Sequence, residues 1–478
     1  IILTNPVSLS DANSINGFTN EQLTLTKVQD GFDNIIAIDN LTSSQVSMAN
    51  AAVTVTGSID KAKVDDLRAL TGGNITVVDL ADQKSALETI ASYTDVILSN
   101  TNITVTDVVN KSEVDTINTY NDAGGVVTVS SITDNFSNIS DVHGTTGISI
   151  GTALITATDP VTLANATALN GFTNAQVTLN AVQDTVSNIT DINKIDSTEV
   201  SMAAATVTVT DPASLSDANA INLMTEGKVT LNSVADTYAN IQEVKKISDA
   251  QVDMGAAAVR VTNNITKSEV DDLLTDTNGK ITVDFITEDK SDLSTINDNT
   301  NVILSTANIT VEDNVSRAEA DIIDAYSNTS GIVTLTSITD TVDNITSVNQ
   351  NANISIANAS VTVTNPATLA NANSINGFTN GLVTLNKVED TVSNVTAIHK
   401  IDNAEVSMSA ATVTVTDNAS LSDANAINLM SQSLVTLNKA SDTYDNLISL
   451  SQLNSSEVSM ASSEVTVTDV VDLKRVNA

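Results

Sequence analysis

Acidic and amide side chains recur together in this sequence at a fixed spacing of four residues. The pattern Asp-x-x-x-Asn, followed by Ile, Val or Leu, occurs at Asp30/Asn34, Asp134/Asn138, Asp184/Asn188, Asp236/Asn240, Asp340/Asn344, Asp390/Asn394 and Asp442/Asn446. Carboxylate and amide oxygens are the ligands that calcium takes in proteins. The pattern therefore suggests a row of calcium sites, with Asp30, Asp184, Asp236, Asp390 and Asp442 as the candidate ligands.

The same pattern has a structural interpretation, which we favour. An Asp before a helix can act as its N-cap, and an Asn such as Asn240 or Asn394 can satisfy backbone groups at the corner of a coil. Two repeats keep the helix pattern but lack the Asn, at Asp82-Gln-Lys-Ser and Asp289-Lys-Ser-Asp. No stretch matches the EF-hand loop or the Gly-rich calcium nonapeptide. Calcium is thus the one cofactor suggested, and a role in capping is preferred.

Other chemistry has little support in the residue types. The chain has no Cys, and its two His, His143 and His399, lack a partner pattern. No Ser/His/Asp set, phosphate loop or zinc spacing is present. Paired carboxylates of the glycosidase kind stay open, but a glycan cleft normally carries aromatics, and these make up 2% of the residues. We predict no catalytic residues and no enzymatic activity.

Charge and hydrophobicity exclude two classes of partner. There are 58 acidic and 20 basic residues, for a net charge of −38. Nucleic acid is disfavoured, because phosphate binding needs clustered Lys and Arg. No run of 18 or more apolar residues occurs, so we expect no membrane insertion. The hydrophobic content of 41% predicts a folded chain.

A strand-like Val-x-Val pattern divides the whole chain into repeats of about 52 residues. We expect one continuous solenoid over residues 1–478. Its repeats are approximately 1–52, 53–102, 103–154, 155–206, 207–258, 259–308, 309–360, 361–412 and 413–464, with a partial repeat at 465–478. Four of them form a super-repeat: Ser58–Leu67 resembles Asn264–Leu273, 206 residues later, and Leu215–Met224 resembles Leu421–Met430.

The repeat at 207–258 shows the expected elements. Alternation over Val207–Thr210 predicts a first strand, which we call strand A. Asp211 then predicts a helix N-cap and Pro212 the first helical residue. Leu215, Ala218 and Ile221 form the apolar stripe of that helix.

Two further strands complete the repeat. Strand B is predicted at Val229–Leu231, and a second short helix or turn at 236–241. Strand C is predicted at Val252–Met254, seven residues before the next strand A. The links from A to B and from B to C are too long for hairpins.

These elements predict an α/β solenoid or β-helix-like fold, in which parallel strands alternate with short helices. We expect two coils per repeat, with strands A and B in one parallel sheet, helices on its outer side and strand C in a shorter second sheet. Because helices need wider spacing than strands, the stack should curve or twist.

The Thr-Val-Thr-Val-Thr strands and the Asp-Thr-x-x-Asn-Ile turns resemble the repeats of very large bacterial surface and secreted proteins. Those include S-layer-like, adhesin-like and filament-forming proteins. The resemblance implies an extracellular or cell-surface location and a structural role. The chain lacks the glycines of calcium-binding β-roll repeats.

Our preferred hypothesis is a non-enzymatic structural protein that forms a fibre, sheet or stalk by head-to-tail self-association. The sequence starts in a strand pattern at Ile2–Thr4 and stops inside a repeat, so we expect the solenoid to continue or to stack on another copy. The alternative is an adhesin or phage-fibre module, calcium-dependent or not, that binds a protein or a cell-surface glycan. A third hypothesis, a polysaccharide-processing enzyme, would need a unique site, which the similarity of the super-repeats disfavours.

Overall fold

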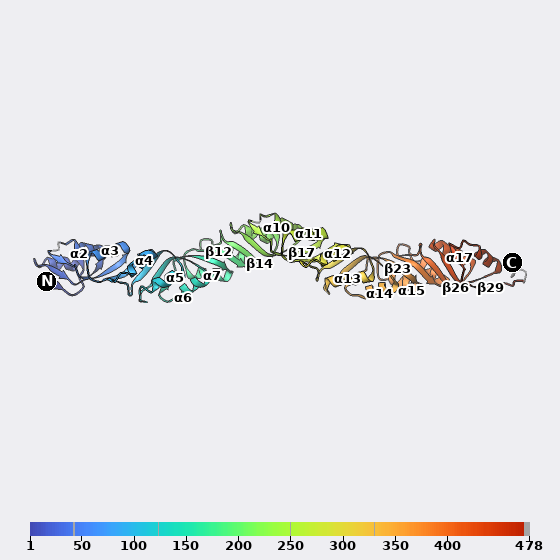
Figure 1. Ribbon diagram of the computed structural model, residues 1–478, viewed down its shortest axis with the longest axis horizontal. Coiled ribbons are helices and arrows are strands. Elements are labelled where there is room, and N and C mark those ends of the chain that lie inside the picture. The colour runs from blue at the N-terminus through green and yellow to red at the C-terminus, as the bar shows by residue number, and fades with distance from the viewer. Residues whose placement is uncertain (42–43, 123, 249, 329, 473–478) are drawn as a thin grey trace. The chain divides into compact units, whose positions relative to one another are not determined.

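The computed structural model describes residues 1–41, 44–122, 124–248, 250–328 and 330–472. The chain forms two compact units. Unit 1 comprises Ile1–Ser233 and Glu243–Met254, and unit 2 comprises Val234–Gln242 and Gly255–Ala478. In both units strands of eight residues alternate with helices of eight to eleven residues (Figure 1).

Unit 1 begins with short elements and then becomes regular. Its strands are β1 (Ile2–Leu3), β2 (Leu23–Leu25), β3 (Lys27–Gly31), β4 (Val46–Ser47), β5 (Ala52–Ile59), β6 (Ile75–Asp82), β7 (Val96–Ile97), β8 (Asn102–Val109), β9 (Val127–Asp134), β10 (Ile148–Ser149), β11 (Leu154–Val161), β12 (Val177–Asp184), β13 (Val200–Ser201), β14 (Thr206–Ala213) and β16 (Val252–Asp253). Its helices are α1 (Leu9–Asn16), α2 (Phe32–Asp39), α3 (Lys61–Leu70), α4 (Lys84–Ala91), α5 (Lys111–Asn118), α6 (Phe136–Gly144), α7 (Leu163–Phe172), α8 (Val186–Asn193) and α9 (Leu215–Asn222).

Strand β15 (Val229–Asp236) and helix α10 (Tyr238–Lys246) each contain a boundary between the units. The strands of unit 2 are β17 (Ala258–Ile265), β18 (Ile281–Glu288), β19 (Val302–Ile303), β20 (Asn308–Val315), β21 (Val333–Asp340), β22 (Ile354–Ser355), β23 (Ser360–Ala367), β24 (Val383–Asp390), β25 (Val406–Ser407), β26 (Thr412–Ala419), β27 (Val435–Asp442), β28 (Val458–Ser459) and β29 (Glu464–Val467). Its helices are α11 (Lys267–Asp276), α12 (Lys290–Asn297), α13 (Arg317–Ser327), α14 (Val342–Gln350), α15 (Leu369–Asn376), α16 (Val392–His399), α17 (Leu421–Ser431) and α18 (Tyr444–Ser451).

Strands A and B of successive coils pair in parallel, which confirms the predicted repeat solenoid. The pairing runs β3–β5–β6–β8–β9–β11–β12–β14 in unit 1 and β17–β18–β20–β21–β23–β24–β26–β27–β29 in unit 2. A helix follows every full-length strand before the chain returns to the sheet. Each repeat therefore contributes two coils, each made of one strand and one helix.

The predicted second sheet for strand C is wrong. In unit 1 the two-residue β13 pairs with the start of β12, where Val200 lies opposite Val177. The following strand A, β14, pairs with the end of the same β12, where Val207 lies opposite Val182. Strands C and A thus lie end to end along one strand B. The seven-residue link is a step within one sheet, because an eight-residue strand B has room for both partners.

The prediction that Asp211 and Pro212 begin a helix is also wrong. Both residues lie in β14, and α9 begins at Leu215 with Ser214 as its N-cap. The equivalent Pro160 of β11 pairs after a shift of register between Ala157 and Pro160. A bulge tolerates a proline, which has no N–H to donate to the ladder. Strand A is therefore eight residues long, twice the predicted length.

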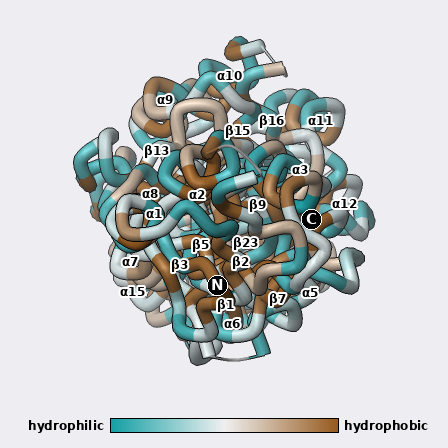
Figure 2. The backbone as a smooth tube through the Cα atoms, turned by 90° about the vertical axis from the view of Figure 1, so that its left-hand side faces the viewer, coloured by the Kyte–Doolittle hydropathy of each residue, from teal (hydrophilic) through white to brown (hydrophobic). Residues whose placement is uncertain are grey.

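The core lies between the sheet and the helices and consists mainly of Val, Ile, Leu and Ala. Strand residues such as Val207 and Val209 and helix residues such as Ala218 and Ile221 are at most 1% exposed. Figure 2 shows the resulting alternation of hydrophobic and hydrophilic residues along the elements. Thin layers of branched aliphatic side chains replace the aromatic core of an ordinary domain.

The helix layer of unit 2 winds about the long axis of that unit. In Figure 1, α11 and α17 lie along the upper edge of the unit and α13 to α15 along the lower edge. Helices need more room than strands, so a stack of strand–helix coils relieves the difference by twisting. Among the described residues, no helix has the length and apolar character needed to span a bilayer.

Candidate functional site

The aspartates of the repeated motif bind the helix of the preceding coil. Asp184, the last residue of β12, accepts a hydrogen bond at Oδ2 from the backbone N–H of Leu163, the first residue of α7 (2.8 Å). Its Oδ1 accepts from the N–H of Thr185 (2.9 Å) and the side-chain amide of Asn188 (2.8 Å). One carboxylate therefore caps one helix and fixes the entrance to the next.

Asp211 makes a similar but simpler bond. Its Oδ1 accepts a hydrogen bond from the backbone N–H of Val186, the first residue of α8 (2.8 Å). Asp211 thus caps a helix, as the sequence suggested, but a helix of the preceding coil. The local cap of α8 is Thr185, whose hydroxyl accepts from the N–H of Asn188.

We call this contact an inter-coil cap: the first N–H of a helix donates to a side chain on the strand of the following coil. The caps on strand B are Asp30, Asp82, Asp134 and Asp184 in unit 1 and Glu288, Asp340, Asp390 and Asp442 in unit 2. The caps on strand A are Asp107, Asp159 and Asp211 in unit 1 and Asn263, Asp313, Asn365, Asp417 and Asp469 in unit 2. Both helices of a repeat are therefore anchored to the next coil.

The positive ends of the helices and their N–H groups favour the charged form of the strand B aspartates. Partial burial raises the pKa of Asp184, but the bonds from Leu163, Asn188 and Thr185 outweigh burial and hold it below the ordinary Asp value. The pKa values of Asp30, Asp134 and Asp340 are lowered in the same way, against partial burial. These carboxylates serve as anionic caps rather than as proton donors.

The candidate calcium ligands use their oxygens in this capping. Asp30, Asp184, Asp390 and Asp442 each accept bonds from two backbone N–H groups and one Asn amide. Asp236 accepts from Thr237 N–H and the Asn240 amide. The described part of the chain holds no cluster of three or more His, Cys, Asp or Glu side chains able to bind a metal.

The predicted role of Asn240 and Asn394 needs correction. Their side-chain amides donate to Asp236 and Asp390 (both 2.8 Å), so they orient a carboxylate instead of satisfying backbone groups. The backbone N–H of each Asn bonds to the hydroxyl of the Thr three residues earlier, Thr237 or Thr391. Asn suits this position because it supplies a donor to the capping Asp.

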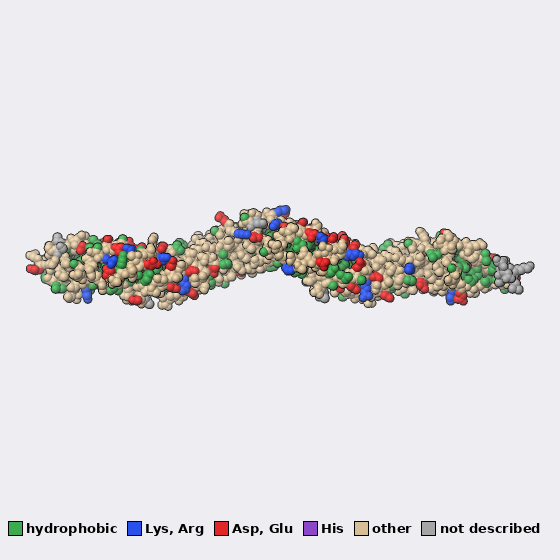
Figure 3. Space-filling view, in the orientation of Figure 1, with side chains coloured by type: hydrophobic (Ala, Val, Ile, Leu, Met, Phe, Trp, Pro, Cys, Tyr) green, Lys and Arg blue, Asp and Glu red, His purple; other side chains and the backbone are tan. Residues whose placement is uncertain are grey.

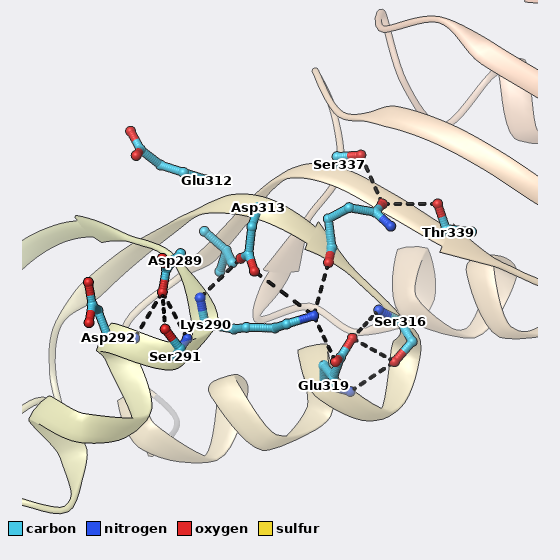
Figure 4. Close-up of polar contacts among 12 residues, drawn as sticks. Asp289, Lys290, Ser291, Asp292, Glu312, Asp313, Ser316, Glu319, Ser337 and Thr339 are labelled. Atoms are coloured by element: carbon cyan, nitrogen blue, oxygen red, sulfur yellow. Dashed lines mark hydrogen bonds and ion pairs between the residues drawn. The ribbon is translucent and has the colours of Figure 1, made fainter.

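Unit 2 also contains a charged clasp, which we define as Lys290, Asp313, Asn314, Ser316 and Glu319 (Figure 4). The Lys290 ammonium lies 2.9 Å from Glu319 Oε1, 3.9 Å from Asp313 Oδ2 and 3.3 Å from the Asn314 carbonyl. It joins the start of α12 to the strand and helix of the following coil. Glu319 also accepts bonds from the N–H and hydroxyl of Ser316, the N-cap of α13.

The clasp has a strong electrostatic effect on Glu319. The Ser316 N–H and the Lys290 ammonium hold the pKa of Glu319 at about 2. The pKa of Lys290 is raised, chiefly by its bond to Glu319. Both groups therefore stay charged near neutral pH.

Unit 1 carries the equivalent of this clasp and a second cluster. Lys84 pairs with Glu113, 206 residues before Lys290 and Glu319. The Arg68 guanidinium lies 3.7 Å from the centre of the Tyr93 ring and bonds to Asp95 (2.8 Å). Figure 3 shows that acidic and basic side chains gather over part of each unit on the visible face.

Buried threonines bridge backbone groups of neighbouring coils, a role that the sequence did not reveal. Thr225 is 7% exposed, and its hydroxyl donates to the Ala205 carbonyl (2.6 Å) and accepts from the Gly227 N–H (2.9 Å). Thr71, Thr173, Thr277 and Thr379 make the same bond to a residue 20 positions earlier. That fixed spacing was the available signal, but Thr is too abundant in this chain for it to stand out.

No protein-family model, curated protein or solved structure matches this chain.

Proposed function

We propose that the chain is a non-enzymatic structural protein of the cell surface or extracellular space, which forms a fibre, sheet or stalk by end-to-end stacking of its coils. The observation that carries this proposal is the inter-coil cap. The same bond joins α7 to β12 through Asp184 and α8 to β14 through Asp211. A bonding scheme in which each coil completes the previous one can be extended without limit.

The use of the carboxylates supports a structural role. An enzyme of the polysaccharide-processing kind needs acids that are free to exchange protons or to act as nucleophiles. Here the most regular carboxylates accept N–H bonds, and Lys290 and Glu319 neutralise each other. The acidic residues thus act in cohesion and in solvation of the surface.

Electron microscopy of the purified protein, with and without a calcium chelator, tests the proposal. We expect fibres or sheets that persist in the chelator, because N–H groups and not metal ions saturate the capping carboxylates. Isolated particles in both conditions would contradict assembly and favour the binding-module alternative. Fibres that dissolve in the chelator would contradict calcium-independent cohesion.

A further inference from the structure

The two kinds of inter-coil cap differ in how many hydrogen bonds they accept. Asp184 on strand B accepts three N–H bonds with its two oxygens, whereas Asp211 on strand A accepts one from Val186. In unit 2 the strand A position is twice an Asn, Asn263 and Asn365, which accept the same single bond (2.8 and 2.9 Å). A side-chain amide has one acceptor oxygen and one NH₂ donor, so it can replace a carboxylate only where one of the two carboxylate oxygens accepts a bond.

The two helices of the repeat at 309–360 are therefore capped by different kinds of side chain. The first helix of a repeat, which follows strand A, is capped by the carboxylate of strand B. The second helix, which follows strand B, is capped from the next strand A, in two cases by an uncharged amide. Protonation turns one acceptor oxygen of a carboxyl group into an O–H donor, which then faces an N–H group.

We propose that the strand B carboxylates form an acid-sensitive fastening, through which a fall in pH releases the first helix of a repeat while second helices with amide caps stay anchored. Adjacent helices of unit 2 show the contrast. Arg317, at the start of α13, donates its N–H to Asp340 (2.9 Å), whereas Val342, at the start of α14, donates to Asn365 (2.9 Å).

Charged groups lie near both of these helix ends, and the first turn of α14 carries Asp343. Asp340 faces Arg317, and the α13 terminus also carries Glu319, paired with Lys290, and Asp321. Arg317 strengthens the charged form of Asp340, and protonation of Glu319 would weaken the same helix end.

At α7 the surroundings are simpler. Asp184 is bonded only to uncharged groups of Leu163, Thr185 and Asn188 among the described residues, and the local cap of α7 is the uncharged Thr162. The carboxylates on the neighbouring strands, Asp159 of β11 and Asp211 of β14, cap α6 and α8 instead. Among the described residues, Asp184 is therefore the single titratable group bonded to the α7 terminus.

The lowered pKa values give the sign of the effect. Partial burial raises the pKa of Asp184 and of Asp340. The N–H bonds to each carboxylate outweigh burial and hold both pKa values below the ordinary Asp value. A group with a lowered pKa in the folded protein contributes stability above its unfolded pKa. That contribution is lost as the pH falls through the folded pKa, so release occurs in acid and not in base.

Hydrogen-exchange mass spectrometry of the full chain, at a series of pH values from neutral to about pH 2, tests this proposal. After correction for the intrinsic exchange rate, we expect protection of α13 to fall by about tenfold or more, as for loss of one hydrogen bond to a charged group. Protection of α14 should stay within about threefold over the range where α13 is lost, because a proton on Asp340 Oδ2, which faces Arg317, leaves Oδ1 to accept from Thr341 and Asn344. Simultaneous loss in α13 and α14, or an α13 that stays protected, would overturn the proposal.

Two variants sharpen the result at α7. In Asp184→Asn, protection of α7 should be low already at neutral pH and should not fall further in acid. In the control Asp211→Asn, the acid-dependent fall in α7 should remain as in the wild type. A full acid response of α7 in Asp184→Asn would also overturn the proposal. If that variant does not fold, wild-type α7 is compared with α14 instead, because the first turn of α7 carries no acidic residue and its N-cap is the uncharged Thr162.

Discussion

The backbone N–H of Leu163 donates to the carboxylate of Asp184, which lies 21 residues later in the chain and one coil further along the stack. This bond ties the start of α7 to the end of β12, and its equivalents recur in both units. A helix N-terminus leaves its first N–H groups unpaired within the helix. Here the next coil supplies an acceptor for the first of these N–H groups. The hydrogen bonding of each helix end is therefore complete only when the following coil is in place.

The first prediction concerns the two cap positions. Asp184→Asn should lower stability by about 2 kcal/mol, because its amide NH₂ would face an N–H group that now bonds to a carboxylate oxygen. Asp211→Asn should change stability by less than about 0.5 kcal/mol, because its single acceptor is kept. The midpoint of urea unfolding of the two variants measures the difference.

The naturally occurring Asn263 and Asn365 serve as internal controls for this comparison. Replacing Asn365 with Asp should also be nearly neutral for stability. Equal losses in Asp184→Asn and Asp211→Asn would show that the number of accepted bonds does not distinguish the two positions.

The sequence predicted the repeat, the parallel sheet and the helices, because those follow from local periodicity. It failed at Asp211-Pro212, which is a good helix start by local rules. The pairing of strand A with its neighbours extends the strand through these residues instead, as the register of Pro160 with Ala181 illustrates. Local signals cannot report how far a neighbouring strand continues.

The candidate site was predicted only where its contacts are local in the sequence. The motif pointed to Asp184 and Asn188 as a structural pair, and they do bond to each other. The partner that gives Asp184 its role, Leu163, donates a backbone N–H, which carries no sequence signature. The lysine–glutamate pair Lys290–Glu319 spans 29 residues and was also beyond a local pattern.

The second prediction concerns α2, whose N-terminus has neither a side-chain N-cap nor an inter-coil cap within the described part of the chain. Its N-cap is Gly31, without a side-chain hydrogen bond, and the position that would supply the inter-coil cap is Gly57. The Lys63 ammonium lies 5.4 Å from the ring of Phe32, the first residue of α2, where positive charge opposes the helix dipole. We expect amides of α2 to exchange about fivefold faster than those of α8, as for the loss of a cap worth about 1 kcal/mol.

Helix α1 is the control for position in the chain. It lies one coil earlier but has a capping box from Ser8 and Asp11 and an inter-coil cap from Asp30. Hydrogen-exchange mass spectrometry should therefore show α1 better protected than α2. The reverse order would mean that caps do not govern the opening of these helices.

The third prediction concerns the charged clasp. Lys290→Met should lower stability only slightly, because the Lys290 and Glu319 side chains are both 39% exposed and solvent screens their attraction. The loss should shrink in high salt, which screens exposed charges. Urea unfolding at low and high salt measures it, and a loss that does not depend on salt would indicate packing of the lysine stem instead.

The clasp also has a defined dependence on pH. The pKa of Glu319 is about 2 in the folded chain, below the ordinary value of 4.5, because of the Ser316 N–H and Lys290. Its contribution is present above the unfolded pKa and is lost as the pH falls toward about 2. The difference in urea midpoint between wild type and Glu319→Gln should therefore vanish in strong acid.

The last prediction concerns the buried hydroxyl of Thr225, which bridges the Ala205 carbonyl and the Gly227 N–H. Thr225→Val keeps the shape of the side chain but leaves both backbone groups without this partner. An unsatisfied buried polar group costs about 1–3 kcal/mol, so the urea midpoint should fall accordingly. A Cβ at Gly227 would lie 2.1 Å from the Ala205 carbonyl oxygen, so the loop has little room to rearrange and recover the bonds.

Thr225→Ser is the matched control, because it retains the hydroxyl and removes one methyl group. Unit 2 has a serine at the equivalent position: Ser431 is fully buried and accepts from the Ser433 N–H (3.2 Å), as Thr225 does from Gly227, but its hydroxyl donates to the Ser433 carbonyl (3.2 Å). The serine variant should therefore lose less stability than the valine variant, although valine is the better match in volume. If valine were tolerated and serine were not, packing of the methyl group, and not the hydroxyl bridge, would be what holds this turn against the neighbouring coil.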